Sequence, residues 1–127
     1  MAHSISPYLF YEDVGAALDW LAKAFGFRET TRMPGPEGQI WHAEMELGDG
    51  SIMLGYPGQD YENPKHRGGT TVGIHVYVDD VDSHYETAKE AGATIVMEPT
   101  DQEYGDRRYD AEDPEGHRWY FAQRLGS

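Results

Sequence analysis

Residues 113–121 read Asp-Pro-Glu-Gly-His-Arg-Trp-Tyr-Phe, and this stretch decides the fold. Pro114 fixes the backbone φ angle for a tight turn, and Gly116 can adopt the positive φ angle that closes it. Beyond the turn, large apolar side chains alternate with more polar ones, which predicts a strand with two different faces. We therefore expect sheets in which one strand face packs against a helix and the other stays open.

Length and composition limit the class of protein. The chain has 127 residues, enough for one compact domain with its own core, and it contains no cysteine. The absence of cysteine excludes a disulfide framework and any cysteine nucleophile or metal site. Residues 1–4 have no basic region, and no apolar run approaches the ~20 residues that a membrane helix needs. We expect a soluble, cytoplasmic protein without a signal peptide.

The formal net charge of −13 bears on possible partners. A chain this acidic repels phosphate backbones, so we expect no nucleic-acid partner, and no membrane partner is indicated either. Acidity can concentrate a cationic ligand near the protein. Its simpler explanation is solubility, because net charge acts on solubility and steering rather than on the fold.

The first half of the chain predicts a strand, a helix and three more strands. Asp13 is a favoured N-cap, and apolar side chains follow it at helical spacing until Gly26, a natural helix stop. Period-two alternation marks the strands, and glycine-rich and proline-rich turns separate them. The strands expected here cover residues 5–11, 27–33, 40–47 and 51–56.

The same order repeats in the second half, where Asp80 begins a helix that ends near Gly92. A shift of 67 residues (80 minus 13) superposes Asp13 on Asp80. A loop is expected at Pro99, and the last strand follows the Asp-Pro-Glu-Gly turn. The strands expected before that turn cover residues 71–78, 94–98 and 107–112.

We therefore predict an α+β fold made of two βαβββ modules in tandem within a single domain, residues 1–127. Module one covers residues 4–57, a linker without apolar period covers 58–69, and module two covers 70–124. Each module keeps an apolar strand face for its helix and leaves a more polar face uncovered. Two such sheets are expected to form a curved mixed-sheet cup with the helices on the outer face.

The chain resembles the vicinal oxygen chelate superfamily, which includes glyoxalases, extradiol dioxygenases and bleomycin-resistance proteins. The duplicated strand-helix-three-strand order carries the resemblance over nearly all of the chain. The helical run at residues 13–21, which closes with residues 25–27, and the Asp-Pro-Glu-Gly turn support it. Because this superfamily hosts many chemistries on one scaffold, the resemblance implies the glyoxalase/bleomycin resistance fold more firmly than a function.

Metal-dependent members of that superfamily carry one His, Glu or Gln ligand on each of the first, fourth, fifth and eighth strands. The resemblance puts Ser6, Met53, Gly73 and Tyr120 at these positions. None of them suits a divalent metal at neutral pH, because glycine has no donor, methionine is soft and the hydroxyls need deprotonation. The resemblance therefore implies a member without metal or another cofactor, similar to the bleomycin-resistance branch.

The strand faces turned away from the helices are expected to line the cup. They combine aromatic rings with a few polar groups, which is typical of a small-molecule site, although such rings can also fill a collapsed cup. A flat aromatic ligand can stack on the rings, a cation can lie against them, and Gly73 leaves room. Trp20, Trp41 and Trp119 are assigned to packing. The predicted ligand-binding residues are Tyr8, Phe10, His42, Glu44, Met53, His75, Tyr77, Arg118 and Tyr120.

Other hypotheses concern the polar side chains. His42, Glu44 and His75 can form a non-standard metal set if they converge. A hydrogen-bonded His–Glu pair is the simpler expectation, because the His-x-Glu spacing puts both side chains on one strand face. His75 or Glu44 can act as a general base in metal-free catalysis. Arg107 and Arg108 have carboxylates nearby and predict a surface cluster of ion pairs.

The sequence favours a metal-independent protein that binds an aromatic or cationic natural product and sequesters it, as bleomycin-resistance relatives do. No catalytic residue and no cofactor are assigned. The alternatives are an enzyme of the same superfamily (a lyase, isomerase or dioxygenase) and an interaction module without a cavity. The resemblance also implies a homodimer.

Overall fold

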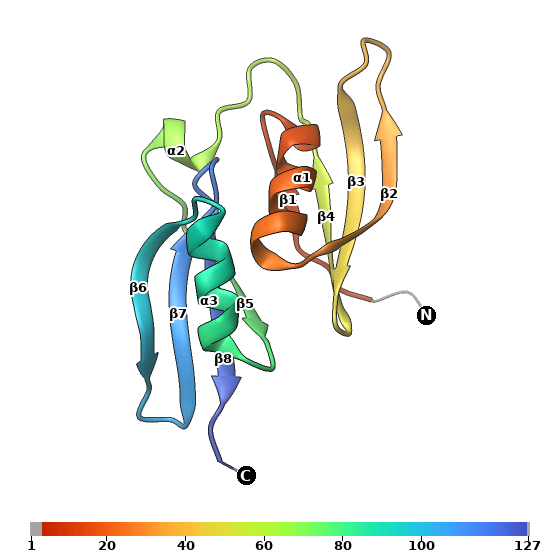
Figure 1. Cartoon of the computed structure of the whole chain (residues 1–127). Helices are drawn as coiled ribbons and strands as arrows, with labels where there is room; N and C mark the ends of the chain where they lie inside the picture. Colours follow the sequence, from red (N-terminus) through yellow and green to blue (C-terminus); the bar gives the residue numbers. More distant parts are fainter. Residues whose placement is uncertain (1–3, 127) are drawn as a thin grey trace. The chain divides into compact units, whose positions relative to one another are not determined.

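A computed structural model of the chain describes residues 4–126 (Figure 1). It contains two compact units, the first ending at Asn63 and the second beginning at Pro64. Residues 1–3 lie outside the described part. They make up most of residues 1–4, the segment from which we predict that the chain has no signal peptide. Within residues 4–126, none of the helices has the length and apolar character needed to cross a membrane.

The first unit has one four-stranded mixed sheet and one helix, as the sequence predicts. Its strand order is β1-β4-β3-β2, with β1 parallel to β4 and the other neighbours antiparallel. The elements are β1 (Tyr8–Phe10), α1 (Val14–Phe25), β2 (Arg28–Pro34), β3 (Ile40–Leu47) and β4 (Gly50–Gly55).

The second unit repeats this topology, with strand order β5-β8-β7-β6 and a parallel β5–β8 pair. The prediction of an α+β fold with two βαβββ modules is confirmed. The elements are α2 (Pro64–Arg67), β5 (Gly73–Tyr77), α3 (Val81–Glu90), β6 (Thr94–Asp101), β7 (Asp106–Glu112) and β8 (Arg118–Arg124).

Equivalent hydrogen bonds mark the repeat in both units. The carboxylate of Asp13 caps α1 by accepting from the backbone N–H of Ala16 at 3.0 Å. Asp80 caps α3 in the same way, accepting from the N–H of Ser83 at 3.1 Å. Each bond satisfies one of the donors that a helix N-terminus leaves unpaired. Gly26 ends α1 in the left-handed conformation, with φ of 84°.

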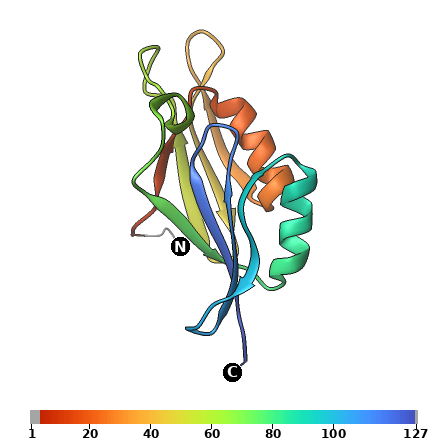
Figure 2. The same cartoon turned by 90° about the vertical axis from the view of Figure 1, so that its left-hand side faces the viewer.

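Each helix packs on one face of its own sheet (Figure 2). In the first unit, Leu21 and Phe25 of α1 are fully buried, as are Met45 and Leu54 of the sheet. The strands supply most of the second core, because α3 is more polar and buries only Val81 and Ala88. The sheet residues that complete this second core are Tyr109, Ala111, Trp119 and Phe121.

The tryptophans differ in burial. Trp119 is fully buried, which confirms its assignment to packing. Trp20 is partly buried, with its ring 4.9 Å from that of Phe25. The assignment of Trp41 to the core is wrong, because half of this residue is exposed. Its ring lies against Gly35 in the β2–β3 loop, where a Cβ atom would collide with the indole.

The Asp-Pro-Glu-Gly turn is held by a buried carboxylate. One oxygen of Asp113 accepts from the N–H groups of Glu115 and His117, at 3.1 and 3.0 Å. The other accepts from the indole Nε1–H of Trp119 at 3.1 Å. Gly116 has the positive φ angle that the sequence predicts, 93°. Asp113 therefore ties the turn to the core through Trp119, the second residue of β8.

One element was not predicted, and one local prediction is wrong. Within the segment 58–69, predicted as a linker, residues Pro64–Arg67 form a helical turn, α2, in which proline takes the first position. The loop predicted at Pro99 is wrong, because this residue lies inside β6, which continues to Asp101. Proline is tolerated there because β6 is an edge strand and its pairing with β7 shifts register between Met97 and Thr100.

Candidate functional site

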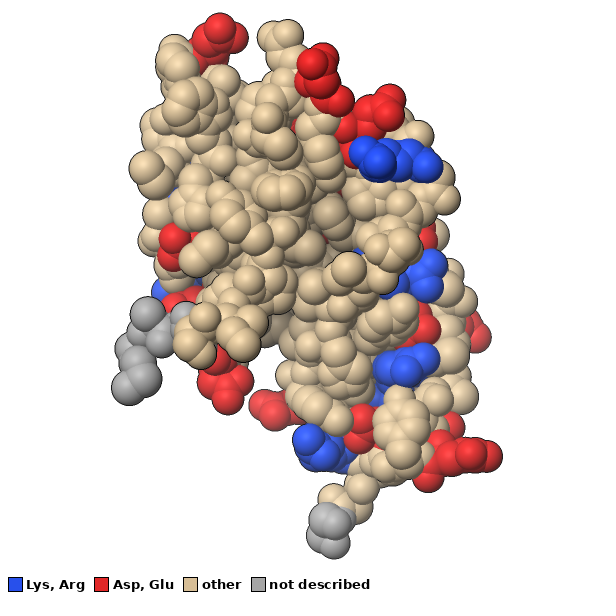
Figure 3. Space-filling model, turned by 180° about the vertical axis from the view of Figure 1, so that it is seen from behind, with Lys and Arg blue, Asp and Glu red and all other residues tan. Residues whose placement is uncertain are grey.

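The sheet face opposite α1 in the first unit, and opposite α3 in the second, is called the open face of that unit. Figure 3 looks from the side opposite to Figure 1 and shows broad uncharged areas. The nine predicted ligand-binding residues divide between the two open faces. Five belong to the first unit and four to the second.

The open face of the first unit brings its five predicted residues together. Tyr8 lies opposite Met53, and Met53 lies opposite Glu44, across three neighbouring strands. Tyr8 is 49% exposed and Phe10 44% exposed, with their ring centroids 5.4 Å apart. His42 is two residues before Glu44 on the same face of β3. This face is aromatic, acidic and accessible within its unit.

A chain of two hydrogen bonds joins three of these side chains. The Tyr8 hydroxyl lies 2.9 Å from Nδ1 of His42, and Nε2 of His42 lies 2.9 Å from Oε2 of Glu44. The expected His–Glu pair is confirmed, and Tyr8 extends it. An ionised carboxylate only accepts, so a neutral imidazole carries its proton on Nε2, and the Tyr8 O–H then donates to Nδ1.

Gly55 positions the Tyr8 ring, a role that the sequence reasoning missed. A Cβ atom at Gly55 would lie 2.7 Å from a ring carbon of Tyr8. The ring can therefore lie against β4 only because this position has no side chain. A glycine inside a predicted strand is the signal for such close approach, and Gly55 ends β4.

The open face of the second unit holds the other four predicted residues. His75 lies opposite Tyr120, and its ring is 4.8 Å from that of Tyr77. Gly73 lies opposite Arg118 on the same strands. The expectation that Gly73 leaves room for a ligand is wrong, because the Tyr120 ring occupies the place of the missing side chain.

Arginines already cover the tyrosine rings of this second face. The Arg124 guanidinium lies 4.3 Å from the ring centroid of Tyr77, and that of Arg108 lies 5.1 Å from the centroid of Tyr120. The hydroxyl of Tyr77 donates to Asp106 at 2.8 Å, and this hydrogen bond raises the tyrosine pKa. Within residues 4–126, these two rings have cations against them, whereas the ring of Tyr8 has none.

Ion pairs extend along β7. The Arg118 guanidinium donates to Glu112 at 3.0 Å, and this hydrogen bond raises the pKa of the guanidinium. The Nε atom of Arg118 is buried and has no hydrogen-bond partner within residues 4–126. Arg107 forms the expected exposed cluster, with Asp82 at 3.1 Å and Asp101 at 3.0 Å.

Arg108 belongs to the open face rather than to that cluster. It pairs with Asp110 at 2.9 Å, and Asp110 is only 7% exposed. Strand alternation explains the difference, because neighbouring residues of β7 point to opposite faces of the sheet. The two adjacent arginines therefore have different surroundings.

The four positions at which metal-dependent relatives carry ligands do not fit a metal here. The Ser6 hydroxyl is hydrogen-bonded to that of Ser51 at 3.0 Å, and Gly73 offers no donor. Met53 offers only a thioether, and Tyr120 packs its ring over Gly73. Across the described residues, no three His, Asp or Glu side chains are grouped as a metal-binding set.

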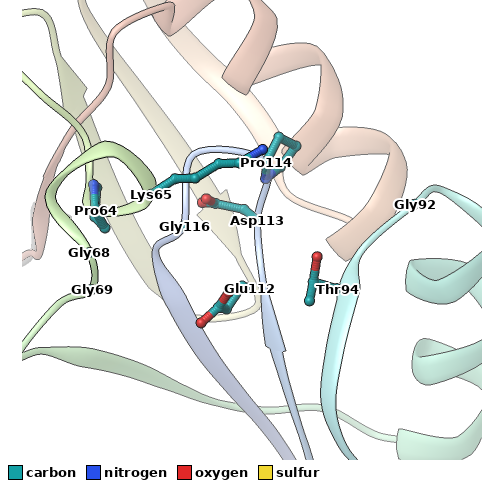
Figure 4. A pocket seen from close by; sticks show the side chains of 10 residues that line it. All are labelled: Pro64, Lys65, Gly68, Gly69, Gly92, Thr94, Glu112, Asp113, Pro114 and Gly116. Carbon is teal, nitrogen blue, oxygen red and sulfur yellow. The ribbon is translucent and has the colours of Figure 1, made fainter.

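The second unit contains a pocket of about 490 Å³ whose lining includes none of the nine predicted residues, although its Glu112 pairs with Arg118 (Figure 4). Glu112 and Thr94 line it from β7 and β6, and Lys65 extends toward the Asp-Pro-Glu-Gly turn. Its wall includes glycines from the segment after α2 and from that turn. Gly116 is essential to this wall, because a Cβ atom there would lie 2.6 Å from the backbone nitrogen of Lys65.

Comparison with known proteins decides the family. The model of the Glyoxalase/Bleomycin resistance protein/Dioxygenase superfamily matches residues 2–121. The chain belongs to this superfamily. The resemblance inferred from its motifs is thereby confirmed. An uncharacterized protein of Mycobacterium tuberculosis is 38% identical over 125 residues, covering 94% of this chain and 74% of that protein.

Solved structures of this superfamily share the fold. TioX from Micromonospora sp. ML1 is 37% identical, with a TM-score of 0.80, and the match covers 98% of this chain and 100% of that chain. A glyoxalase/bleomycin resistance protein/dioxygenase from Nocardioides is 20% identical, with a TM-score of 0.70 and coverage of 100% and 87%. The latter likeness concerns the fold alone.

Proposed function

We propose that this superfamily member binds an aromatic or cationic natural product without using a metal, and sequesters it. The observation that carries the proposal is the open face of the first unit. There two neighbouring aromatic rings, Tyr8 and Phe10, are both more than two-fifths exposed next to the carboxylate of Glu44. Exposed clustered rings favour binding of another flat or cationic group, which gains both apolar contact and attraction to the ring faces.

The charge of Glu44 supports a cationic ligand. Within residues 4–126, the carboxylate of Glu44 pairs with a histidine, His42, whereas Glu46 on the same strand is neutralised by Arg28 at 2.6 Å. The side chain of Glu44 is 40% exposed, so its second carboxylate oxygen can receive a positive group. The net charge of −13 adds long-range attraction for cations.

In the second unit, we propose different contacts for His75, Tyr77, Arg118 and Tyr120. Because arginines lie against the two tyrosine rings, a cationic group gains less there than at Tyr8. The Nε–H of Arg118 has no hydrogen-bond partner within residues 4–126 but is buried, so it can donate to a ligand acceptor only after the side chains that cover it move. The open face of the first unit therefore suits a planar cation better than that of the second unit does.

Thermal unfolding with bleomycin and with ethidium tests the proposal. A ligand that binds only the folded protein stabilises it, by about 2.7 kcal/mol at a hundredfold excess over Kd. We expect at least one of the two cations to raise the melting temperature, and the Tyr8→Ala/Phe10→Ala variant to lose the shift. Tyr104→Ala is the matched control, since Tyr104 is an exposed tyrosine (63%) outside β1. An equal shift in the double variant contradicts the proposed site.

Elemental analysis of protein purified without chelators tests the metal-independent part. We expect no stoichiometric metal, because the residues at the four ligand positions of the family do not fit one. If the wild type retains one equivalent of metal and His75→Ala loses it, the protein is not metal-independent. That result does not decide whether the protein binds an aromatic cation, which the thermal unfolding experiment tests.

An enzyme is the second candidate, favoured by the hydrogen-bonded chain from Tyr8 through His42 to Glu44. A hydroxyl, an imidazole and a carboxylate in this order can move a proton during acid–base catalysis. Mass spectrometry of a bound ligand separates the two candidates. If the protein sequesters its ligand, the ligand is recovered unchanged after prolonged incubation. If the wild type converts the ligand to a product and His42→Phe does not, the protein is an enzyme.

We also propose that the protein acts in the cytoplasm as a homodimer, as the superfamily resemblance implies. Sedimentation equilibrium tests the second part. A mass of about twice the 14.3 kDa of one chain supports it, and a mass equal to one chain contradicts it.

A further inference from the structure

We propose that Glu44, acting through His42, fixes the Tyr8 hydroxyl as a hydrogen-bond acceptor, so that the open face of the first unit selects ligands that present an N–H or O–H donor. This inference rests on the proposed function and deepens it, because it names the polar group that the ligand must carry. Tyr8 is the specificity-determining residue, and His42 and Glu44 are positioning residues.

The direction of the hydrogen bonds follows from the chemistry of the groups. Glu44 can only accept, so the proton of the neutral imidazole must lie on Nε2, where the two atoms are 2.9 Å apart. Nδ1 then carries a lone pair, and the Tyr8 hydroxyl at 2.9 Å is the group that can donate to it. The single hydroxyl proton of Tyr8 is thereby used, and its oxygen keeps only acceptor capacity.

The surroundings of the phenol leave that oxygen available on the open face. Tyr8 is 49% exposed, and no hydrogen bond to its oxygen other than the one with His42 is found among residues 4–126. The absence of a side chain at Gly55 lets the ring lie against the sheet, which fixes its place. Phe10, whose ring centroid lies 5.4 Å from that of Tyr8, and Met53, the register partner of Tyr8 on β4, have side chains without a donor.

Substituting Glu44 changes this polarity without removing the phenol. In Glu44→Gln, the amide can donate to Nε2 as well as accept from it, so both histidine tautomers become available. In the second tautomer, Nδ1–H donates to the Tyr8 oxygen and the phenol O–H turns toward the ligand. The selectivity for donors should then disappear, although the ring surface stays in place.

The histidine tautomer provides a test that needs no ligand. The ¹⁵N NMR shifts of His42 at about pH 8 distinguish the protonated from the unprotonated ring nitrogen. We expect only the Nε2–H tautomer in the wild type and in Glu46→Gln. In Glu44→Gln we expect both tautomers. Glu46→Gln is the matched control, because it removes the same charge from the same strand but Glu46 pairs with Arg28. A wild-type protein with the Nδ1–H form overturns the inference.

Calorimetry with two probes tests the selectivity itself. 4-Amino-1-methylquinolinium and 1-methylquinolinium have the same ring system and permanent charge, but only the first has N–H donors. We expect the wild type and Glu46→Gln to bind the amino probe about tenfold more tightly, as one additional hydrogen bond allows. In Tyr8→Phe and Glu44→Gln the ratio should fall to about one. A ratio that persists in Tyr8→Phe overturns the inference.

The two tests separate failure of the inference from failure of the proposed function. If neither probe binds the wild type, the proposed function fails for cationic aromatic ligands. The tautomer of His42 then decides alone whether the Tyr8 hydroxyl is a hydrogen-bond acceptor. If both probes bind with equal affinity, the proposed function stands and the donor selectivity is wrong.

Discussion

Replacement of Asp113 by asparagine should lower the free energy of unfolding by about 2–4 kcal/mol. Asp113 is 4% exposed, and its carboxylate accepts from two N–H groups of the turn and from the indole N–H of the fully buried Trp119. Asparagine can still accept the two backbone bonds through its amide oxygen. Its NH₂ group then faces the indole Nε1–H, so two donors oppose each other in the core.

The magnitude is the sum of two effects. A buried indole donor left without a partner costs about 1–3 kcal/mol. The two remaining bonds also weaken, because hydrogen bonds to an ionised carboxylate are about twice as strong as those to a neutral acceptor. Urea unfolding of the wild type and Asp113→Asn measures the total. Asp49→Asn, in the exposed β3–β4 turn, is the control and should change stability by less than about 0.5 kcal/mol.

A double-mutant cycle with Trp119→Phe isolates the indole bond. Phenylalanine has no donor, so in that background Asp113→Asn should cost about 1–2 kcal/mol less than in the wild type. An unchanged cost of Asp113→Asn in the two backgrounds refutes the reasoning, because it means that the indole bond does not contribute to the stability of the turn.

Three further predictions concern buried or crowded positions. Burial raises the pKa of Tyr109, so as the pH rises the unfolded state loses its phenolic proton before the folded state does. The free energy of unfolding should therefore fall as the pH rises above about 10. In Tyr109→Phe, which has no phenol at this position, the fall should be shallower. Gly73→Val should displace the Tyr120 ring and lower the melting temperature, and Tyr120→Ala should relieve most of this loss. Gly116→Ala should destabilise the protein by about 1–3 kcal/mol in urea unfolding, because its φ angle is positive and Lys65 lies against it.

Most of the fold could be predicted from the sequence because its signals are local. Asp13 and Asp80 cap their helices, and alternating apolar residues mark the strands that pack beneath them. The helical turn α2 and the extension of β6 through Pro99 were missed. A four-residue helix has too few positions to show a period, and a proline normally indicates a loop unless the strand is known to be at an edge.

The candidate site was predictable in composition but less so in geometry. The spacing of His42 and Glu44 indicated their pair, because strand alternation alone puts them on one face. The link to Tyr8 depends on the parallel pairing of β1 with β4, which local sequence does not specify. The same holds for the ring of Tyr120, whose place over Gly73 depends on contact between strands distant in sequence.

We propose that the ligand binds to the open face of the first unit. Chemical-shift mapping by NMR, with ethidium or another cation that raises the melting temperature, tests it most directly. We expect the largest ligand-induced shifts within the first unit at Tyr8, Phe10 and His42, and we expect them to vanish in Tyr8→Ala/Phe10→Ala. Shifts confined to the pocket beside Lys65 and Gly116, with Tyr8 and Phe10 unaffected, would contradict it.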